Sequence, residues 1–258
     1  MASGQSYKQQ EAIYHNDGRE PALLDFIQAH PEYPQMKNSP ARVLAAIDQY
    51  GREKAFLMNV GHEKGRIVTD IIAQRKPSIM IELGGYVGYS TILFADAVRK
   101  AGGKKYLSLE LSPTFATVSK ALVQLAGLDD IVEYMIGPCR DSLRALRSTR
   151  SGALDLIFLD HAKFAYTNDL KLCEELALVG QGTTLVADNV ICPGNPKYLE
   201  YLRSPPAKKI EEAKTVEAEK SVDVSIGNPR LIYDTSLVYG LAPTGEQDGV
   251  EISHCLGE

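Results

Sequence analysis

The chain has 258 residues, of which 28 are Lys or Arg and 33 are Asp or Glu, so its formal net charge is −5. This length and the 44% share of hydrophobic residues suit one large α/β domain or two small ones, with enough apolar material for a sizeable core. A mildly acidic chain without a basic tract is a poor nucleic-acid binder, and no apolar run is long enough to predict a membrane span.

Cysteine usage and the N-terminal residues bear on the cellular compartment. The chain contains four widely separated cysteines, Cys139, Cys173, Cys192 and Cys255. None belongs to a CxxC pair, which favours buried free thiols in a reducing compartment over a zinc site or a disulfide framework. The N-terminus lacks the apolar segment of a secretory signal, and its acidic residues are atypical of a mitochondrial presequence. We therefore expect a cytoplasmic protein. Tryptophan is absent.

The N-terminal part of the chain predicts helices. The first 20 residues are polar and are expected to be frayed. Apolar spacing predicts helices over Pro21–Gln28 and Ala41–Met58, joined by the proline-rich connector His30–Pro40. We expect residues 1–57 to form a helical cover and residues 58–258 to form the main domain, the whole being one compact unit.

From Gly61 onward the pattern changes to alternating elements. Gly61 and Gly65 are expected to bracket a turn before a helix over Arg66–Gln74. Five short apolar runs then predict strands buried on both faces: Ser78–Leu83, Tyr106–Leu111, Ile131–Gly137, Leu154–Asp160 and Thr183–Asn189. Helical patterns separate them: Ser90–Lys100, Pro113–Ala126, Asp141–Thr149 and Asn168–Leu178. Alternating strands and helices predict a parallel sheet with helices on both faces.

The C-terminal part of the chain predicts a hairpin. Two β-rich runs, Leu231–Tyr239 and Val250–Leu256, are joined by a turn-rich segment without a helix, so we expect the last pair of strands to be antiparallel. The highly charged segment Lys208–Lys220 is expected to be a solvated strand or loop.

A glycine loop follows the first predicted strand, where ligands bind in open α/β sheets. Gly84 and Gly88 let the backbone approach a ligand, and Glu110, at the end of the second strand, suits a pair of ribose hydroxyls. A dinucleotide fingerprint requires glycine where Tyr86 stands. The pattern acid-x-Gly-x-x-x-Gly is instead common in methyltransferases that use S-adenosylmethionine. A plain tight turn with Glu110 as a helix cap is the simpler alternative.

Oxygen ligands follow the fourth and fifth strands. Asp160, Asp188 and Asn189 are expected to converge, and carboxylate and amide oxygens suit Mg²⁺. Without a cation, two converging carboxylates would repel and one pKa would rise. Lys163 lies three residues after Asp160, and a lysine beside a divalent cation is a candidate general base. No cysteine or histidine cluster is expected nearby. The alternatives are acids that cap loops and a surface lysine.

Together these residues give the sequence a family resemblance. The chain resembles the catechol O-methyltransferases, in a fungal-type form, from about Ala22 to its C-terminus. The matching segments are Ala45–Tyr50, Met58–Gly61, Glu82–Ser90, Phe158–His161 with Lys163, Ala187–Gly194 and Asp248–Glu251.

The resemblance implies a Rossmann-like class I methyltransferase fold, with a seven-stranded, mostly parallel sheet, an antiparallel last strand and helices on both faces. It implies contacts with S-adenosylmethionine by Met58, Val60, Glu82, Gly84, Tyr86, Ser90, Glu110, Leu111, Cys139, Arg140, Asp160 and His161. It implies Mg²⁺ ligation by Asp160, Asp188 and Asn189, with Lys163 as the base. It implies substrate contacts by Phe56, Met58, Lys163, Asn189, Pro193 and Tyr239.

The departures from the family fall on the ligand sites. Ala162 stands where the family has a tryptophan that packs on adenine, and Phe56 stands where a second tryptophan gates the catechol pocket. The family's adenine-contacting Ser-Gln is here Cys139-Arg140. The family's late acid, which holds the second catechol hydroxyl, aligns with Tyr239, although Asp234 or Glu246 could supply the acid instead.

We therefore expect an Mg²⁺-dependent O-methyltransferase that acts on one hydroxyl of a vicinal dihydroxy aromatic small molecule. A non-catalytic S-adenosylmethionine-binding interaction protein is the alternative. A nicotinamide dehydrogenase is disfavoured, because its YxxxK pattern at Tyr50–Lys54 precedes the glycine loop. The expected partners are a phenolic acceptor, no nucleic acid and no membrane, with the chain as a monomer or homodimer.

Overall fold

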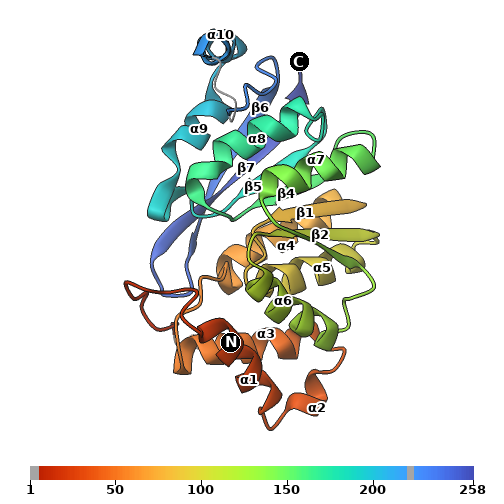
Figure 1. Cartoon of the computed structure of the whole chain (residues 1–258), viewed down its shortest axis with the longest axis vertical. Coiled ribbons are helices and arrows are strands. Elements are labelled where there is room, and N and C mark those ends of the chain that lie inside the picture. Colours follow the sequence, from red (N-terminus) through yellow and green to blue (C-terminus); the bar gives the residue numbers. More distant parts are fainter. Residues whose placement is uncertain (1–5, 220–223) are drawn as a thin grey trace.

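The computed structural model describes residues 6–219 and 224–258 and consists of a sheet with helices on both faces (Figure 1). The helices are α1 (Arg19–Gln28), α2 (Tyr33–Met36), α3 (Pro40–Glu53), α4 (Gly61–Arg75), α5 (Tyr89–Lys100), α6 (Pro113–Leu125), α7 (Cys139–Thr149), α8 (Tyr166–Glu175), α9 (Pro196–Arg203) and α10 (Pro206–Glu219). The strands are β1 (Ile79–Leu83), β2 (Lys105–Glu110), β3 (Val132–Ile136), β4 (Leu156–Leu159), β5 (Thr184–Ala187), β6 (Ile232–Leu241) and β7 (Gln247–Gly257). The short turns η1 (Lys163–Ala165) and η2 (Val190–Gly194) follow β4 and β5.

The seven strands form one sheet in the order β3-β2-β1-β4-β5-β7-β6. The first five strands in this order are parallel to one another, whereas β7 runs antiparallel to both β5 and β6. Leu83 pairs with Leu109 and Leu159, and Leu159 pairs with Ala187, so four carboxyl ends lie along one edge. The order reverses between β1 and β4, which is where ligands bind in such sheets. The predicted sheet, including the antiparallel last strand, is confirmed.

The sheet separates two apolar cores. Helices α4, α5 and α6 cover one face, and α7, α8 and α9 cover the other (Figure 1). Alternate strand residues point to opposite faces: Met80 and Phe158 join the first core, while Ile81 and Ile157 join the second. Helices α1 and α3 form a further layer beyond α5 and α6 (Figure 1). This arrangement leaves the carboxyl edge of the strands for loops.

The N-terminal segment is more ordered than expected. Tyr7 is buried, and its hydroxyl donates to Asp48 Oδ1 at 2.5 Å. Helix α1 begins at Arg19, whose guanidinium donates to the Phe56 carbonyl at 2.7 Å and to Glu11 at 2.9 Å. The prediction of frayed residues was therefore wrong for residues 6–20, because buried polar contacts fix a segment that carries few apolar side chains. Residues 1–5 lie outside the described part.

Three further details of the helical region differ from the predictions. The expected long helix ends at Glu53, so the segment from Ala55 to Val60 is a loop, and the predicted connector contains the short helix α2. Gly61 and Gly65 do not bracket a turn but lie in the first turns of α4. A side chain at Gly65 would come within 2.6 Å of Leu93 Cδ2, so the glycine lets α4 pack closely on α5.

The charged segment after α9 is helix α10 rather than a strand or loop. Lysine, glutamate and alanine all favour helices, and Lys208 lies 3.8 Å from Glu212 one turn later. The side chain of Lys209 is buried, and its Nζ donates to the Leu231 carbonyl at 2.9 Å. This contact attaches the helix to the start of β6. Lys220, at the end of the predicted segment, lies outside the described residues.

All four cysteines are free thiols, as predicted. Cys173 and Cys255 are buried, Cys139 is half-buried and Cys192 is exposed, so the expectation of burial holds for only part of the set. Across residues 6–219 and 224–258, no helix has both the length and the apolar character needed to cross a membrane. The cytoplasmic location, the boundary at residue 57 and the state of monomer or homodimer stay predictions.

Candidate active site

The glycine loop joins β1 to α5 at the carboxyl edge of the sheet. Gly84 and Gly88 adopt φ of 93° and 92°, in the left-handed region that favours glycine. A side chain at Gly84 would come within 2.7 Å of the Asp160 carbonyl, so only glycine lets this loop pass so close to the end of β4. Tyr86, between them, also has a positive φ of 45°. The loop thus presents backbone at the first turn of α5, as the sequence predicted.

Glu110 connects the glycine loop to the end of β2. Its Oε2 accepts hydrogen bonds from the backbone N–H groups of Gly85 (3.1 Å) and Tyr86 (2.8 Å), and its Oε1 accepts from Ser112 N–H (2.8 Å). Burial raises the pKa of Glu110 above its usual range. The next residue, Leu111, is 68% exposed. Glu110 therefore holds the glycine loop in place and precedes an exposed leucine side chain.

Glu82 lies behind the loop and is fully buried. Its Oε2 accepts from Ser90 Oγ and from the Tyr106 hydroxyl, both at 2.8 Å, and its Oε1 accepts from Thr91. Burial raises the pKa of Glu82 to about 7. The sequence reasoning grouped Glu82 with cofactor contacts, but the structure places it where it holds Ser90 rather than on an open surface.

The N-terminal layer reaches the same loop. The Tyr86 hydroxyl donates to Glu20 at 3.0 Å, and its ring packs edge-on against Phe115 with centroids 5.1 Å apart. On the loop before α4, Phe56 and Val60 are buried and Met58 is half-buried. The predicted residues of this loop therefore lie between the N-terminal layer and the start of α4.

The predicted oxygen ligands follow β4 and β5. Asp188 is buried, and burial together with the negative charge of Asp160 raises its pKa to about 7. Its Oδ1 makes no hydrogen bond, although Lys64 Nζ lies 2.8 Å away. Asn189 has a positive φ of 58°, and its Nδ2 donates to Asp248, which leaves its Oδ1 available. Two mutually repelling carboxylates beside an amide oxygen are a donor set that a hard divalent cation fits.

Lys163 lies at the edge of this group. Its Nζ is 2.8 Å from Asp160 Oδ1 and 2.6 Å from the Tyr166 hydroxyl. The same hydroxyl donates to the Leu159 carbonyl at 2.9 Å and lies 3.2 Å from the carbonyl of Asp188. Lys163 is therefore a positioned group and not a free surface lysine.

Two charged residues that the sequence reasoning did not select lie under the oxygen ligands. Lys64 is 1% exposed, and its Nζ bonds Asp188 Oδ2 at 2.9 Å and Asp248 Oδ2 at 2.6 Å. Burial disfavours the charged ammonium, but the two acids outweigh it and raise the pKa of Lys64. Asp248 also accepts a hydrogen bond from the Cys192 backbone N–H at 2.9 Å. Burial would raise the pKa of Asp248, but the charge of Lys64 and this hydrogen bond lower it below its usual range.

A signal for Lys64 was present in the sequence. Lys64, Val68, Ile71 and Ile72 follow helical spacing on the buried face of α4. Treating Gly61 and Gly65 as turn residues hid this periodicity. Asp248 stands in the segment Asp248–Glu251, which matched the family without a role attached to it.

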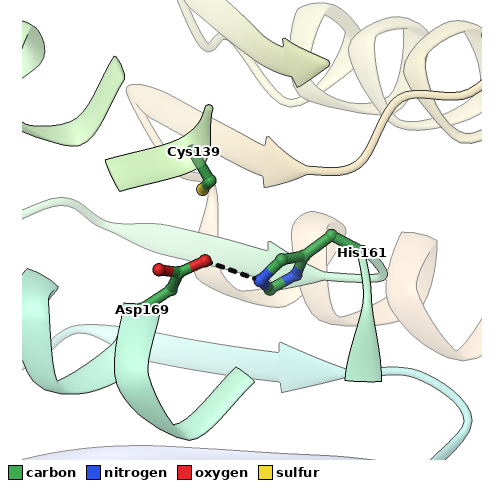
Figure 2. A group of neighbouring side chains, drawn as sticks. All are labelled: Cys139, His161 and Asp169. Carbon is green, nitrogen blue, oxygen red and sulfur yellow. Dashed lines mark hydrogen bonds and ion pairs between the residues drawn. The ribbon is translucent and has the colours of Figure 1, made fainter. Parts of the chain in front are cut away.

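The side chains of His161 and Cys139 form a second group, separate from the oxygen ligands. His161 Nε2 is 2.9 Å from Asp169 Oδ2, and the His161 ring stacks on Tyr166 with centroids 4.8 Å apart. Figure 2 shows Cys139 directed toward this pair. Cys139 and Arg140 are the first residues of α7, and burial raises the pKa of the Cys139 thiol. The expectation of no cysteine or histidine cluster near the acids was therefore wrong, because α7 and α8 bring distant residues together.

The strand pairing of the hairpin places the candidate substrate residues Tyr239 and Asp234 at opposite edges of the sheet. Tyr239 pairs with Gly249, close to Asp248, and is 58% exposed at the edge that carries Asp188. Asp234 pairs with His254, which in turn pairs with Thr184 at the start of β5. Asp234 therefore lies at the opposite edge and cannot supply the late acid. Glu246 is exposed in the hairpin turn, and Pro193 is exposed in η2.

The missing tryptophans leave different surroundings at their two positions. Ala162 is exposed, and Phe164, two residues later, is 92% exposed. Phe56 is buried, and its ring packs edge-on against Tyr14 with centroids 6.1 Å apart. Ala162 therefore leaves the site beside His161 exposed, whereas Phe56 connects the site near Met58 to the N-terminal segment.

Comparisons with known proteins agree with this arrangement. A family model described as O-methyltransferase matches residues 42–226. The chain is 38% identical to catechol O-methyltransferase of Bos taurus over 72% of this chain and 66% of that protein, and 39% identical to the enzyme of Mus musculus over 72% and 68%. A probable O-methyltransferase of Mycobacterium tuberculosis is 36% identical over 72% of this chain and 79% of that protein. The chain spans about two thirds of the length of the Bos taurus and Mus musculus enzymes.

Solved structures show the same architecture. An O-methyltransferase from Bacillus cereus in complex with SAH has a TM-score of 0.58 at 20% identity, over 92% of this chain and 96% of that one. The O-methyltransferase TomG from Streptomyces achromogenes, in complex with SAM, has a TM-score of 0.58 at 18% identity, over 95% and 100%. The fold is thus the Rossmann-like fold of class I methyltransferases. With the family match over residues 42–226, the chain belongs to the O-methyltransferase family.

Replacement of Lys64 by Met should strongly destabilise the protein. It would leave the buried carboxylates of Asp188 and Asp248 without their cation, a change that typically costs about 3–5 kcal/mol. Urea unfolding followed by circular dichroism measures the effect. The control is Lys208→Met, which breaks a solvent-exposed pair with Glu200 and should change the stability far less. Equal losses in the two variants would contradict the assignment.

The buried carboxyl group of Glu82 should make the free energy of unfolding depend on pH. Its pKa is about 7 in the folded chain against a reference value of 4.5, so the folded state retains a proton that the unfolded state releases. The free energy of unfolding should therefore fall between about pH 4.5 and pH 7, by about 3 kcal/mol from this group, and then level off. In Glu82→Gln this contribution should vanish. Urea unfolding across this pH range tests it, with exposed Glu133→Gln as control; parallel profiles for the wild type and Glu82→Gln would refute it.

Proposed function

We propose that this O-methyltransferase transfers the methyl group of S-adenosylmethionine to one hydroxyl of a vicinal dihydroxy aromatic acceptor, with Mg²⁺ as cofactor. The observation that carries the proposal is the position of Lys163. Asp160 and Tyr166 hold its amine at the carboxyl edge of the sheet, where Asp188 and Asn189 also lie. The glycine loop lies beside the same edge, in contact with the Asp160 backbone. A methyl donor and an acceptor hydroxyl could therefore meet next to Lys163.

The cofactor residues divide into three groups along the carboxyl edge. Met58, Val60, Gly84, Tyr86 and Ser90 would hold the amino-acid end against the loop and the first turn of α5, where unpaired N–H groups favour a carboxylate. Glu110 would accept from the ribose hydroxyls, with Leu111 beside it. Cys139, Arg140 and His161 would surround the adenine. When bound, S-adenosylmethionine supplies a methyl group on a positively charged sulfur.

The metal would be held by Asp160, Asp188 and Asn189. Two observations support this fit: Asp188 Oδ1 accepts no hydrogen bond, and the negative charge of Asp160 adds to burial in raising the pKa of Asp188. The two carboxylates thus repel each other even though Lys64 pairs with Asp188 and Lys163 pairs with Asp160. Asp248 positions the third donor by accepting from Asn189 Nδ2 at 2.9 Å. Bound Mg²⁺ would supply Lewis-acid chemistry, lowering the pKa of an acceptor hydroxyl and fixing its orientation.

Lys163 is the proposed general base. Its amine takes the proton from the attacking hydroxyl, and the ammonium that forms is stabilised by Asp160 at 2.8 Å. The O–H bond breaks as an N–H bond forms, and the acceptor oxygen then gains the methyl group that the sulfur releases. Because Tyr166 and Asp160 fix Nζ from two sides, the main contribution of the protein is positioning.

A vicinal pair of hydroxyls fits this edge better than a single phenol. One oxygen must face Lys163, and a second oxygen beside it would reach the same metal. Phe56 and Met58 from the loop before α4, Pro193 from η2 and Tyr239 from the hairpin would surround the ring. The Tyr239 hydroxyl would replace the family's late acid as the partner of the second hydroxyl.

Replacement of Lys163 by Met should lower kcat by roughly 10²–10⁴-fold, the usual contribution of a general base, while cofactor binding persists. Methyl transfer from radiolabelled S-adenosylmethionine to catechol measures turnover, and calorimetry with S-adenosylhomocysteine measures binding. The control is Lys104→Met, an exposed lysine before β2, which should retain full activity. Normal turnover in Lys163→Met would exclude the base. No transfer to any acceptor by the wild type, with intact binding, would favour the non-catalytic alternative.

Removal of the metal should abolish methyl transfer, and Mg²⁺ should restore it. Asp188→Asn should weaken Mg²⁺ activation by more than the roughly 10- to 100-fold that loss of an outer-shell partner costs. Asp234→Asn, at the opposite edge of the sheet, is the matched control and should respond to Mg²⁺ like the wild type. Full turnover in EDTA would exclude the metal role. Equal turnover with catechol and with a monophenol would exclude the vicinal acceptor.

A further inference from the structure

Three side chains with different donor atoms converge beside the strand edge: Cys139, His161 and Asp169 (Figure 2). They come from the first turn of α7, the segment after β4, and α8. One ligand atom from each lies within 4.8 Å of the other two. Asp169 has no part in the proposed reaction, so that reaction does not explain why these three side chains lie together.

The three side chains are held in place by their surroundings. The side chains of His161 and Asp169 are 12% and 8% exposed, and the His161 ring stacks on Tyr166 at an interplanar angle of 13°. Cys139 is half-buried in the first turn of α7, which fixes the position of its sulfur. The three donor atoms are therefore already gathered in one place before any ligand binds.

The spacing of the donor atoms is close to that of a tetrahedral metal site. Ligand atoms about 2.0–2.3 Å from Zn²⁺ lie about 3.4–3.6 Å from one another. The Nε2–Oδ2 separation of 2.9 Å between His161 and Asp169 would need to open by about half an ångström, and the sulfur of Cys139 lies within 4.8 Å of both atoms. On binding, the thiol proton leaves to solvent and the neutral imidazole donates its lone pair.

We propose that Cys139, His161 and Asp169 bind one thiolate-seeking divalent cation of the Zn²⁺ class, and that this ion excludes the adenine end of the cofactor. A thiolate, an imidazole and a carboxylate select such an ion over Mg²⁺. Three protein ligands leave the fourth position open to water. The exclusion rests on the proposed function, because Cys139 and His161 are also the proposed adenine contacts; the metal binding does not.

Titration of the metal-free full chain with Co²⁺ tests the binding. The expected result is the near-ultraviolet charge-transfer absorption of a cobalt–thiolate bond, saturating at one ion per chain and displaced by Zn²⁺ but not by Mg²⁺. Cys139→Ser should abolish the absorption, and Asp169→Asn should weaken Co²⁺ binding at least about tenfold. Cys192→Ser is the matched control, an exposed cysteine outside the group, and should retain it. Asp160→Asn, at the proposed Mg²⁺ site, should retain it too.

No thiolate absorption in the wild type, or the same absorption in folded Cys139→Ser, would overturn the site. For the exclusion, calorimetry should show S-adenosylhomocysteine binding to the metal-free chain and at least tenfold weaker binding at saturating Zn²⁺. In Cys139→Ser, Zn²⁺ should leave that binding unchanged. Unchanged binding in the wild type would overturn the exclusion. S-adenosylhomocysteine that fails to bind the metal-free chain would instead overturn the proposed function, while the cobalt absorption still decides the metal site.

Discussion

The buried ammonium of Lys64 is the constraint on which the proposed metal edge depends. It bonds Asp188 at the end of β5 and Asp248 near the start of β7, and so joins α4 to two strands. Burial of any one of these charges alone would be costly. Burial of all three is possible because the ammonium of Lys64 pairs with both carboxylates. Asp248 then holds both Asn189 and the backbone of η2. Lys64 and Lys163 together carry two positive charges against the three acids Asp160, Asp188 and Asp248, so this edge has more carboxylates than cations to pair with them, which suits a divalent cation.

A second set of polar contacts ties the N-terminal layer to the glycine loop. Arg19 donates to the Phe56 carbonyl, and the adjacent Glu20 accepts from the Tyr86 hydroxyl. Phe56 belongs to the proposed acceptor site and Tyr86 to the proposed cofactor site. The layer formed by α1 and α3 therefore packs on the sheet helices and also supports both loops that would contact the two substrates. Displacement of α1 would loosen both loops together.

The parts of the site that the sequence predicted share one property: they depend on local pattern and on topology. The apolar strands predicted the sheet, and the rule that ligands lie at carboxyl ends then selected Glu110, Asp160 and Asp188. The missed residues depend on contacts across long separations. Lys64 and Asp188 are 124 positions apart, and only the packing of α4 on the sheet brings them together. The pairing of Asp169 with His161 likewise needs the direction in which α8 returns, which no local pattern reveals.

The chain that leaves β4 separates two different sets of donor atoms within two residues. Asp160 faces Lys163 and Asp188, where the donors are oxygens, whereas His161 faces Asp169 and Cys139, where nitrogen and sulfur join them. Oxygen donors select ions such as Mg²⁺, and the mixed set selects ions such as Zn²⁺. An exposed alanine at position 162 leaves the second set without a covering tryptophan. If both proposals hold, one divalent ion would support methyl transfer and another would oppose it, and the serine that the family carries in place of Cys139 would remove the second effect.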